Sequence, residues 1–313
     1  MGWFGRRGIA AALLVLVGLA PSLAAAEDAK LKAVATFSIL ADLVAQVGGD
    51  RVAVTSLVGP DADAHGYAPT PGDARKLAEA NLIVVNGLGF EGWMERLIKA
   101  SGSKAPLVVA SKNVKTIAGS HDHDDHDHGD HGHDHGEGDH ADPHAWQNVA
   151  NVKLYVANIR DGLTAADPAN AALYTANAAA YTQKLDALDA EIRAALAAIP
   201  QERRRIITTH DSFGYFSAAY GMRFLAPQGI STDSEAGPKD VARIIRQIRR
   251  DKVPAVFVES IADPRLMQQI ARESGAKVGG RIYSDALSAP GGPAPGYLEM
   301  MRSNLIAFRE ALS

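Results

Sequence analysis

Two series of short apolar segments, each alternating with amphipathic helical patterns, occupy the two halves of the 313-residue chain. Alternation of this kind is typical of parallel strands covered on both faces by helices. The predicted strands span residues 31–37, 51–58, 82–85 and 107–110 in the first half and 205–209, 223–226, 255–259 and 277–283 in the second. The pattern therefore predicts the α/β class, with two parallel-sheet lobes.

A long segment with helical periodicity separates the two series. Asp167 and Pro168 are typical of a helix start, with Asp as the N-cap and proline at the first helical position. Apolar residues then recur at helical spacings: Tyr174, Tyr181, Leu185, Leu188, Ile192 and Leu196. A helix over 167–198 would be roughly 45 Å long. We expect this one stiff backbone helix, rather than several crossing loops, to join an N-terminal lobe (27–166) to a C-terminal lobe (199–313).

The beginning of the chain is typical of a secretory signal. Arg6 and Arg7 precede a short apolar run, and three alanines end at Ala26. The run is shorter than the roughly 20 residues that a membrane-spanning helix needs, so a cleaved signal over 1–26 is favoured over a membrane anchor. The chain has no cysteine, which argues against a lipid-anchoring Cys, disulfides and thiolate metal ligands. We expect an exported, unanchored protein.

The charge distribution gives no indication of a nucleic-acid partner. The formal net charge is −4, and residues 121–142 hold nine acidic side chains with no Lys or Arg. The rest of the chain is therefore close to neutral. Four arginines share one face of a predicted helix opposite an apolar face, and we interpret them as a solvated helix surface: Arg243, Arg246, Arg249 and Arg250.

Eight of the eleven histidines lie in one acidic segment, 121–140, which contains no apolar residue. These are His121, His123, His126, His128, His131, His133, His135 and His140. A segment with nothing to bury is predicted to be disordered without metal. Imidazoles on a mobile chain can hold several ions, each weakly because binding orders the chain. The hypothesis is that the segment collects metal for another site, and the alternative is solvated low-complexity filler.

The other three histidines, His65, His144 and His210, each lie at a predicted loop or strand end. Ligands of open α/β sheets gather at the carboxyl ends of the strands. Asp285 follows the last predicted strand and occupies a corresponding position in the second lobe. These four residues are the candidate metal ligands, although any lone histidine could instead be a hydrogen-bonded structural residue.

Six segments carry a resemblance to a known family. They are DAHGYAPTP (63–71), VVNGLGFE (84–91), DPH (142–144), THDSF (209–213), VFVE (256–259) and YSDAL (283–287). Together they resemble the cluster A-I solute-binding proteins of zinc and manganese ABC transporters, over nearly the whole mature chain. The resemblance is closest to AztC-like and ZnuA-like zinc-binding members with three His, one Asp and a His-rich loop.

The resemblance implies two α/β lobes joined by one long helix, with the metal in the cleft between them. Its ligand positions fall on His65, His144, His210 and Asp285, of which Asp285 is the least secure. It also implies a periplasmic, non-enzymatic monomer that delivers its ion to an inner-membrane ABC permease, with a periplasmic zinc chaperone as a further candidate partner.

The donor set favours Zn²⁺ as the bound metal. Three imidazoles and one carboxylate suit four-coordinate zinc, whereas manganese prefers more oxygen, and the manganese members of the family have a carboxylate where this chain has His210. Copper also binds imidazole. Affinity should fall with pH because protons compete for the ligands. Glu91, Asp211 and Glu259 are candidates for fixing the imidazoles.

Three alternatives to zinc delivery remain open at this point. A secreted zinc hydrolase could use the three histidines with Asp285 as a base, in which case an exchangeable water should occupy the metal. The chain contains no His-Glu-x-x-His motif and no evident nucleophile–base pair, which disfavours this reading. A manganese-binding protein or a surface metal-binding adhesin of the same family would share the fold, although the lack of cysteine argues against the adhesin.

Overall fold

The computed structural model describes residues 1–3, 29–119 and 141–313, and it confirms the predicted fold class. Each half of the molecule contains one four-stranded parallel sheet, with strand orders β2-β1-β3-β4 and β6-β5-β7-β8. The strands are β1 (Leu31–Phe37), β2 (Val52–Val58), β3 (Leu82–Val85), β4 (Leu107–Val109), β5 (Arg205–Ile207), β6 (Arg223–Leu225), β7 (Ala255–Glu259) and β8 (Lys277–Ile282). The two sheets therefore have the same topology. In each sheet the second strand lies on one side of the first strand and the third strand on the other, and ligands of such folds bind at this reversal of strand order.

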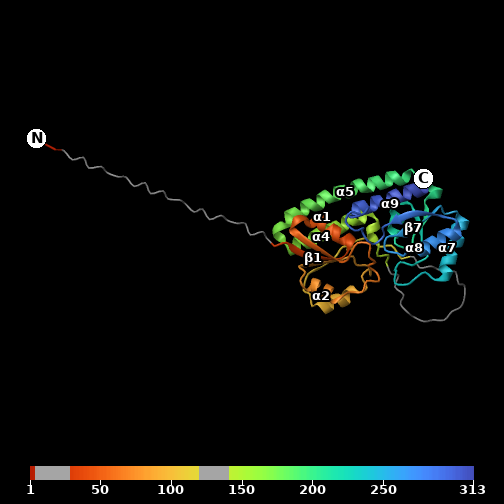
Figure 1. The fold of residues 1–313 in the computed structure, drawn as a ribbon, viewed down its shortest axis with the longest axis horizontal. Helices are drawn as coiled ribbons and strands as arrows, with labels where there is room; N and C mark the ends of the chain where they lie inside the picture. Colours follow the sequence, from red (N-terminus) through yellow and green to blue (C-terminus); the bar gives the residue numbers. More distant parts are fainter. Residues whose placement is uncertain (4–28, 120–140) are drawn as a thin grey trace.

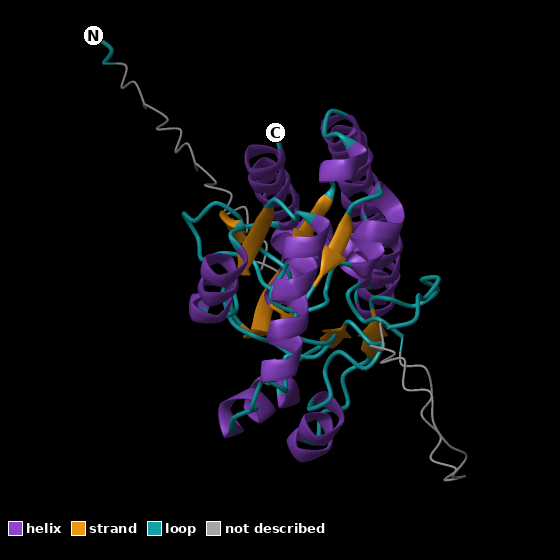
Figure 2. Cartoon of the chain, turned by 90° about the vertical axis from the view of Figure 1, so that its right-hand side faces the viewer, coloured by secondary structure: helices purple, strands orange, loops and turns teal. Residues whose placement is uncertain are grey.

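Helices cover the sheets as the alternation predicts, and Figure 2 shows them on both sides of the strands in the C-terminal half. They are α1 (Ser38–Gly48), α2 (Pro71–Ala78), α3 (Met94–Ser101), α4 (Val149–Ala166), α5 (Ala171–Ala197), α6 (Gly214–Tyr220), α7 (Pro238–Asp251), α8 (Pro264–Ser274) and α9 (Tyr297–Leu312). In the described part of the chain, no helix is both long and apolar enough to cross a membrane. Residues 4–28, which hold most of the predicted signal, and 120–140 lie outside the described residues.

The long helix α5 spans 27 residues and runs along both halves of the molecule (Figure 1). The apolar positions that recur in the sequence form its buried face, as predicted: Tyr174, Tyr181, Leu185, Leu188, Ile192 and Leu196. Its start differs from the prediction, because Pro168–Asn170 form a 3₁₀ turn before it. Asp167 does not cap the backbone, since its carboxylate accepts hydrogen bonds from Tyr174 and Asn170 instead.

Helix α4, which was not predicted from the sequence, lies directly before α5 and packs against it. Asn148 caps its first turn by accepting a hydrogen bond from the backbone N–H of Ala150 at 2.9 Å. Its hydrophobic face contacts α1, β3 and β4, and therefore covers the first sheet. The two helices form a hairpin. Helix α4 packs on the first sheet, whereas α5 runs along both halves of the molecule.

Helix α9 is a second connection between the halves, because it packs against α5 and β8 and also reaches α1. Asp42 on α1 accepts a hydrogen bond from the backbone N–H of Tyr297, the first residue of α9, at 2.8 Å. One continuous hydrophobic core therefore includes α1, α4, α5, α9 and the strands of both sheets. A second, smaller core lies under α7 and α8 on the other face of the second sheet.

Candidate metal centre

Four loops at the carboxyl ends of strands bring the candidate ligands together. His65 lies in the loop after β2, His210 follows β5, Asp285 follows β8, and His144 precedes the short turn Ala145–Gln147. All four side chains are buried, and each offers one ligand atom within 4.8 Å of the others. The structure thus gathers the four candidate ligands of the main site into one cluster between the two sheets.

The distances within the cluster are those of a small coordination shell. The Nε2 atom of His65 lies 3.1 Å from Nε2 of His144 and 3.4 Å from Oδ2 of Asp285. The Nε2 atom of His210 lies 3.0 Å from Oδ2 of Asp285, and Nε2 of His144 lies 3.8 Å from Oδ1. Ligands at about 2.0–2.1 Å from a tetrahedral centre are separated by about 3.3 Å. A single ion therefore fits among these atoms.

Polar atoms without partners mark the same place. Within the described ranges, both carboxylate oxygens of Asp285 and Nε2 of His210 are buried and have no hydrogen-bond partner outside the cluster, where they contact one another and the other candidate ligands. Burying such groups without compensation is costly. A bound cation would satisfy all three atoms at once, so the donor set fits a divalent metal.

The two histidines of the first half follow the same local pattern. In Asp63-Ala64-His65 and in Asp142-Pro143-His144, the aspartate Oδ1 accepts the backbone N–H of the histidine two residues later at 2.9 Å. Asp142 Oδ1 also lies 2.8 Å from Nδ1 of His144. This contact fixes the imidazole with Nε2 directed at the cluster.

Glu259, at the end of β7, performs the corresponding task in the second half. Its carboxylate lies 2.5 Å from Nδ1 of His210 and accepts the backbone N–H groups of Thr209 and His210 at 2.7 and 2.9 Å. It also accepts the hydroxyl of Ser284 at 2.7 Å, next to Asp285. Glu259 therefore positions two candidate ligands from different strands.

The carboxylates determine the charge state of the cluster. Burial by itself lowers the pKa of His210, but the charges of Glu259 and Asp285 raise that pKa well above its ordinary value. Burial raises the pKa of Asp285, but His210 and His144 hold it well below its usual range. Positive charge at the centre of the cluster is thus stabilised. A divalent cation bound by the four donor atoms would supply that charge.

Glu91 and Asp211 have different contacts. Burial raises the pKa of Glu91, whose carboxylate accepts hydrogen bonds from Thr36 and from the backbone N–H groups of Asn86 and Gly87. Asn86 in turn donates to the carbonyl of Pro143, so Glu91 supports the loop before His144. Asp211 donates its backbone N–H to the carbonyl of Gly229.

Two positioning groups were not identified from the sequence. Asp142 orients His144, and its signal was the repeated Asp-x-His pattern. Trp146 and Gln147 donate hydrogen bonds to the carbonyl of Ser284 at 2.9 and 2.8 Å, which fixes the residue before Asp285. These two hydrogen bonds join residues that are 138 and 137 positions apart in the sequence, and no local pattern indicates them.

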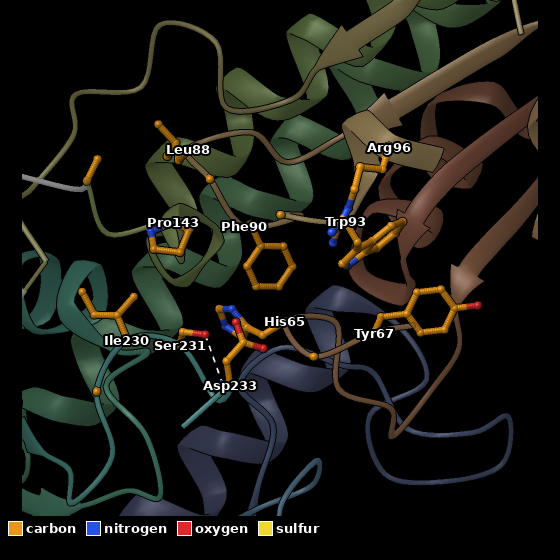
Figure 3. Close-up of a pocket in the computed structure, with 15 residues that line it drawn as sticks. His65, Tyr67, Leu88, Phe90, Trp93, Arg96, Pro143, Ile230, Ser231 and Asp233 are labelled. Atoms are coloured by element: carbon orange, nitrogen blue, oxygen red, sulfur yellow. Dashed lines mark hydrogen bonds between the residues drawn. The ribbon is translucent and has the colours of Figure 1, made fainter. Parts of the chain in front are cut away.

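Aromatic rings close one side of the cluster. The Phe90 ring meets that of His65 edge-on, with centroids 4.6 Å apart, and Trp146 packs against Phe90 and His144. Figure 3 shows Phe90 beside His65 in a cavity of about 840 Å³, with Trp93 and Tyr67 along the same wall. Of the four candidate ligands, His65 is the one that lines this cavity.

The His-rich segment 121–140 lies outside the described residues, but the nearby residues Ala118 and Ala141 are described. Ala118 and Ala141 pair as an isolated antiparallel bridge, so the segment leaves and rejoins the body at one place. Asp142 follows this bridge directly, and its backbone N–H donates to the carbonyl of Ile117. The segment is therefore attached next to the loop that carries His144.

The fold and the cluster define a class: a two-lobed α/β protein with a buried metal centre between its sheets. Residues 33–311 match the family model described as zinc-uptake complex component A, periplasmic. The chain therefore belongs to this family, the periplasmic metal-binding proteins that serve as substrate-binding components of ABC transporters. Members of the family are solute-binding proteins that deliver a metal to a permease, and they are not enzymes.

Individual relatives cover most of this chain. The iron-binding protein YfeA of Yersinia pestis is 34% identical over 272 residues, which is 87% of this chain and 83% of YfeA. The manganese ABC transporter substrate-binding lipoprotein PsaA of Streptococcus pneumoniae is 33% identical, over 91% of this chain and 89% of PsaA. The solved structure of the periplasmic zinc-binding protein TroA from Treponema pallidum is 30% identical, with a TM-score of 0.82, over 91% of this chain and 99% of TroA.

Proposed function

We propose that this protein captures Zn²⁺ and delivers it to an inner-membrane ABC importer, with His65, His144, His210 and Asp285 as the four ligands. The observation that carries the proposal is the buried cluster itself. Its ligand atoms are spaced close to the edges of a zinc-sized tetrahedron, and the buried ligand atoms of two of the four residues, His210 and Asp285, have no hydrogen-bond partner outside the cluster among the described residues. A shell filled by four protein ligands suits binding and release of an ion rather than activation of a water.

The donor atoms support zinc over manganese. The relatives are named for iron, manganese and zinc, so their names do not choose among the metals. Three imidazole nitrogens and one carboxylate favour four-coordinate zinc, and manganese prefers sites richer in oxygen. The imidazole of His210, held by Glu259, is the donor that most favours zinc.

The rest of the proposal concerns the route of the ion. Export through a cleavable signal over residues 1–26 would place a monomer in the periplasm, where its permease can receive the metal. The eight histidines of segment 121–140 would assist acquisition, and a periplasmic zinc chaperone is a candidate donor to them. The attachment of this segment beside the His144 loop supports such transfer over a short path.

Metal analysis of the purified full-length protein tests the identity of the ion. We expect one tightly held zinc that is retained against an excess of Mn²⁺ during dialysis. In His210→Asp, an oxygen donor replaces an imidazole, so the preference should shift towards Mn²⁺. Tighter binding of Mn²⁺ than Zn²⁺ by the native chain would overturn the assignment of zinc while leaving the metal centre intact.

A further inference from the structure

The carboxylate of Asp63 joins the two lobes. Its Oδ1 accepts the backbone N–H of His65 at 2.9 Å, and its Oδ2 accepts the hydroxyl of Thr232 at 2.6 Å. Thr232 lies in the loop between β6 and α7, in the other half of the molecule and 169 residues away. One side chain therefore couples the turn that presents His65 to a loop of the second lobe.

The same loop is attached at its other end to the His210 segment. The backbone N–H of Gln228 donates to the carbonyl of Thr209, and that of Asp211 donates to the carbonyl of Gly229. These bonds continue the parallel pairing of β5 and β6 past the ends of the two strands, as far as His210 and Gln228. Residues 228–232 thus form a short bridge from the backbone that flanks His210 to the carboxylate that positions His65.

The bridge also separates two cavities. Ser231 and Asp233 line the cavity of about 840 Å³ that His65 borders (Figure 3). Thr232, between them, lines a second cavity of about 490 Å³ together with Asp63 and His210. Separation of Thr232 from Asp63 would join the two cavities above the metal cluster and admit water to the ligands.

The contact between Asp63 and Thr232 is suited to repeated breaking. Both side chains are half-buried, so water can replace the hydrogen bond without leaving a buried group unpaired. The bonds from Trp146 and Gln147 to the carbonyl of Ser284 are fully buried and also join distant parts of the chain. Breaking those would leave unpaired polar groups, so they are expected to persist while the loop opens.

We propose that the Asp63–Thr232 hydrogen bond is an interlobe latch, and that Asp63 and Thr232 are positioning residues that set how fast the bound ion leaves. The inference rests on the proposed metal centre. In the latched form, His65 and His210 are held on either side of one ion. Loss of the hydrogen bond frees the bridge and speeds release, while the ligands themselves and the number of ions bound stay the same.

The test compares Thr232→Val, which keeps the shape but loses the hydroxyl, with Thr232→Ser, which keeps the hydroxyl. Release of Zn²⁺ from the full-length protein is followed by stopped flow after addition of a chromogenic chelator. Because Thr232→Val loses a hydrogen bond to a carboxylate, we expect its release rate to increase by roughly tenfold. Thr232→Ser keeps the hydroxyl and should release zinc at the native rate. Thr182→Val, the same substitution in helix α5 and outside the bridge, is the control and should release zinc at the native rate.

Three results would overturn the latch: a native release rate in Thr232→Val, equal acceleration in Thr232→Val and Thr232→Ser, or equal acceleration in Thr182→Val. The zinc association rate and the melting temperature of the metal-free protein separate a latch from general damage, because both should be unchanged in Thr232→Val. Metal analysis of the native protein is done first. Absence of bound zinc there would refute the proposed function, whereas one bound zinc with no effect of the valine refutes the latch alone.

Discussion

At the scale of single residues, the metal centre consists of imidazoles paired with carboxylates. Asp142 faces Nδ1 of His144, and Glu259 faces Nδ1 of His210. Each pairing selects the tautomer that leaves Nε2 free to bind a metal. The histidines stand out in the sequence by their isolation. Their partners are harder to recognise: Glu259 was one of three candidate carboxylates and Asp142 was not among them, because a carboxylate that orients an imidazole resembles any other until the fold brings the two together.

The first prediction concerns the ligands. His144→Ala and His210→Ala should each weaken zinc binding by roughly 100-fold or more, because each removes a neutral donor that the fold holds in place. Asp285→Ala should weaken binding less, since three imidazoles remain and a water can occupy the fourth position. Competition against a chelator of known affinity gives the three constants. Asp161→Ala, an exposed residue paired with Arg160, serves as the control. Native affinity in all three variants would refute the assignment of the site.

The second prediction concerns orientation. Asp142→Asn keeps an oxygen that can accept the backbone N–H of His144 but removes the negative charge beside Nδ1. Zinc affinity should fall by about 10- to 100-fold, the usual effect of such outer partners. Isothermal titration of the metal-free protein measures it, and circular dichroism shows whether the fold is retained. An unchanged affinity would mean that the charge of Asp142 does not contribute to binding.

At the scale of elements, strands were predicted better than helix ends. Strands β1, β3 and β7 agree residue for residue with the apolar runs, because a buried parallel strand is a short, continuous hydrophobic segment. Helix α3 begins at Met94 and not at the nearby Glu91, whose carboxylate accepts hydrogen bonds from backbone N–H groups of the preceding loop. Helix α4 was missed. Leu154 is apolar but lies on the exposed face of α4, and few charged residues mark that face. The periodicity that identifies an amphipathic helix is therefore weak.

Helix α2 begins with a complete N-terminal cap. Thr70 and Asp73 form a capping box, and Tyr67 and Lys76 also contact the Asp73 carboxylate. Burial alone would raise the pKa of Asp73, but these hydrogen bonds lower it well below its ordinary value. Burial and the neighbouring Asp73 raise the pKa of Tyr67 to about 12, so the phenol stays protonated and donates at neutral pH.

The third prediction follows from this cap. Asp73→Ala should lower the free energy of unfolding of the metal-free protein at pH 7 by about 1–2 kcal/mol. Because the folded pKa is depressed, this stabilisation is present above the unfolded pKa of about 3.9 and is lost as the pH falls towards the folded value. Urea unfolding at pH 7 and below pH 4 measures both. Glu79→Ala, in an exposed pair with Lys32, should change little at either pH. A constant difference between Asp73→Ala and native protein across the range would refute the linkage.

At the scale of the whole molecule, two helices rather than one hold the lobes together. Helix α5 spans both halves, and α9 returns from the second sheet to contact α1 of the first. Asn304 on α9 also bonds the backbone of Tyr283 with both atoms of its amide, two residues before Asp285. The C-terminal helix therefore links the position of a candidate ligand to the shared core.

The fourth prediction concerns the His-rich segment as a separable part. Residues 121–140 can be replaced by a short glycine linker, because Ala118 and Ala141 already lie side by side. The shortened protein should keep one tight zinc and lose additional, weaker ions, since a mobile chain must be ordered each time that it binds. Metal titration followed by mass spectrometry counts them. A variant with all eight histidines changed to asparagine keeps the length and acidity of the segment, and it should behave as the deletion does. Equal zinc binding by all three proteins would exclude the segment from metal capture.

The sequence by itself determined the α/β class, the long helix and the four residues of the cluster. Hydrophobic periodicity and isolated histidines at strand ends are local signals, and they can be recognised without knowledge of the fold. Only the tertiary structure decided that Glu259 orients the imidazole of His210, that α9 joins the lobes, and that Asp63 of one lobe bonds Thr232 of the other. Each of these depends on a contact between segments that are far apart in the sequence, and the packing of the helices and sheets brings those segments together. A hydrogen bond across 169 residues leaves no periodic trace along the chain.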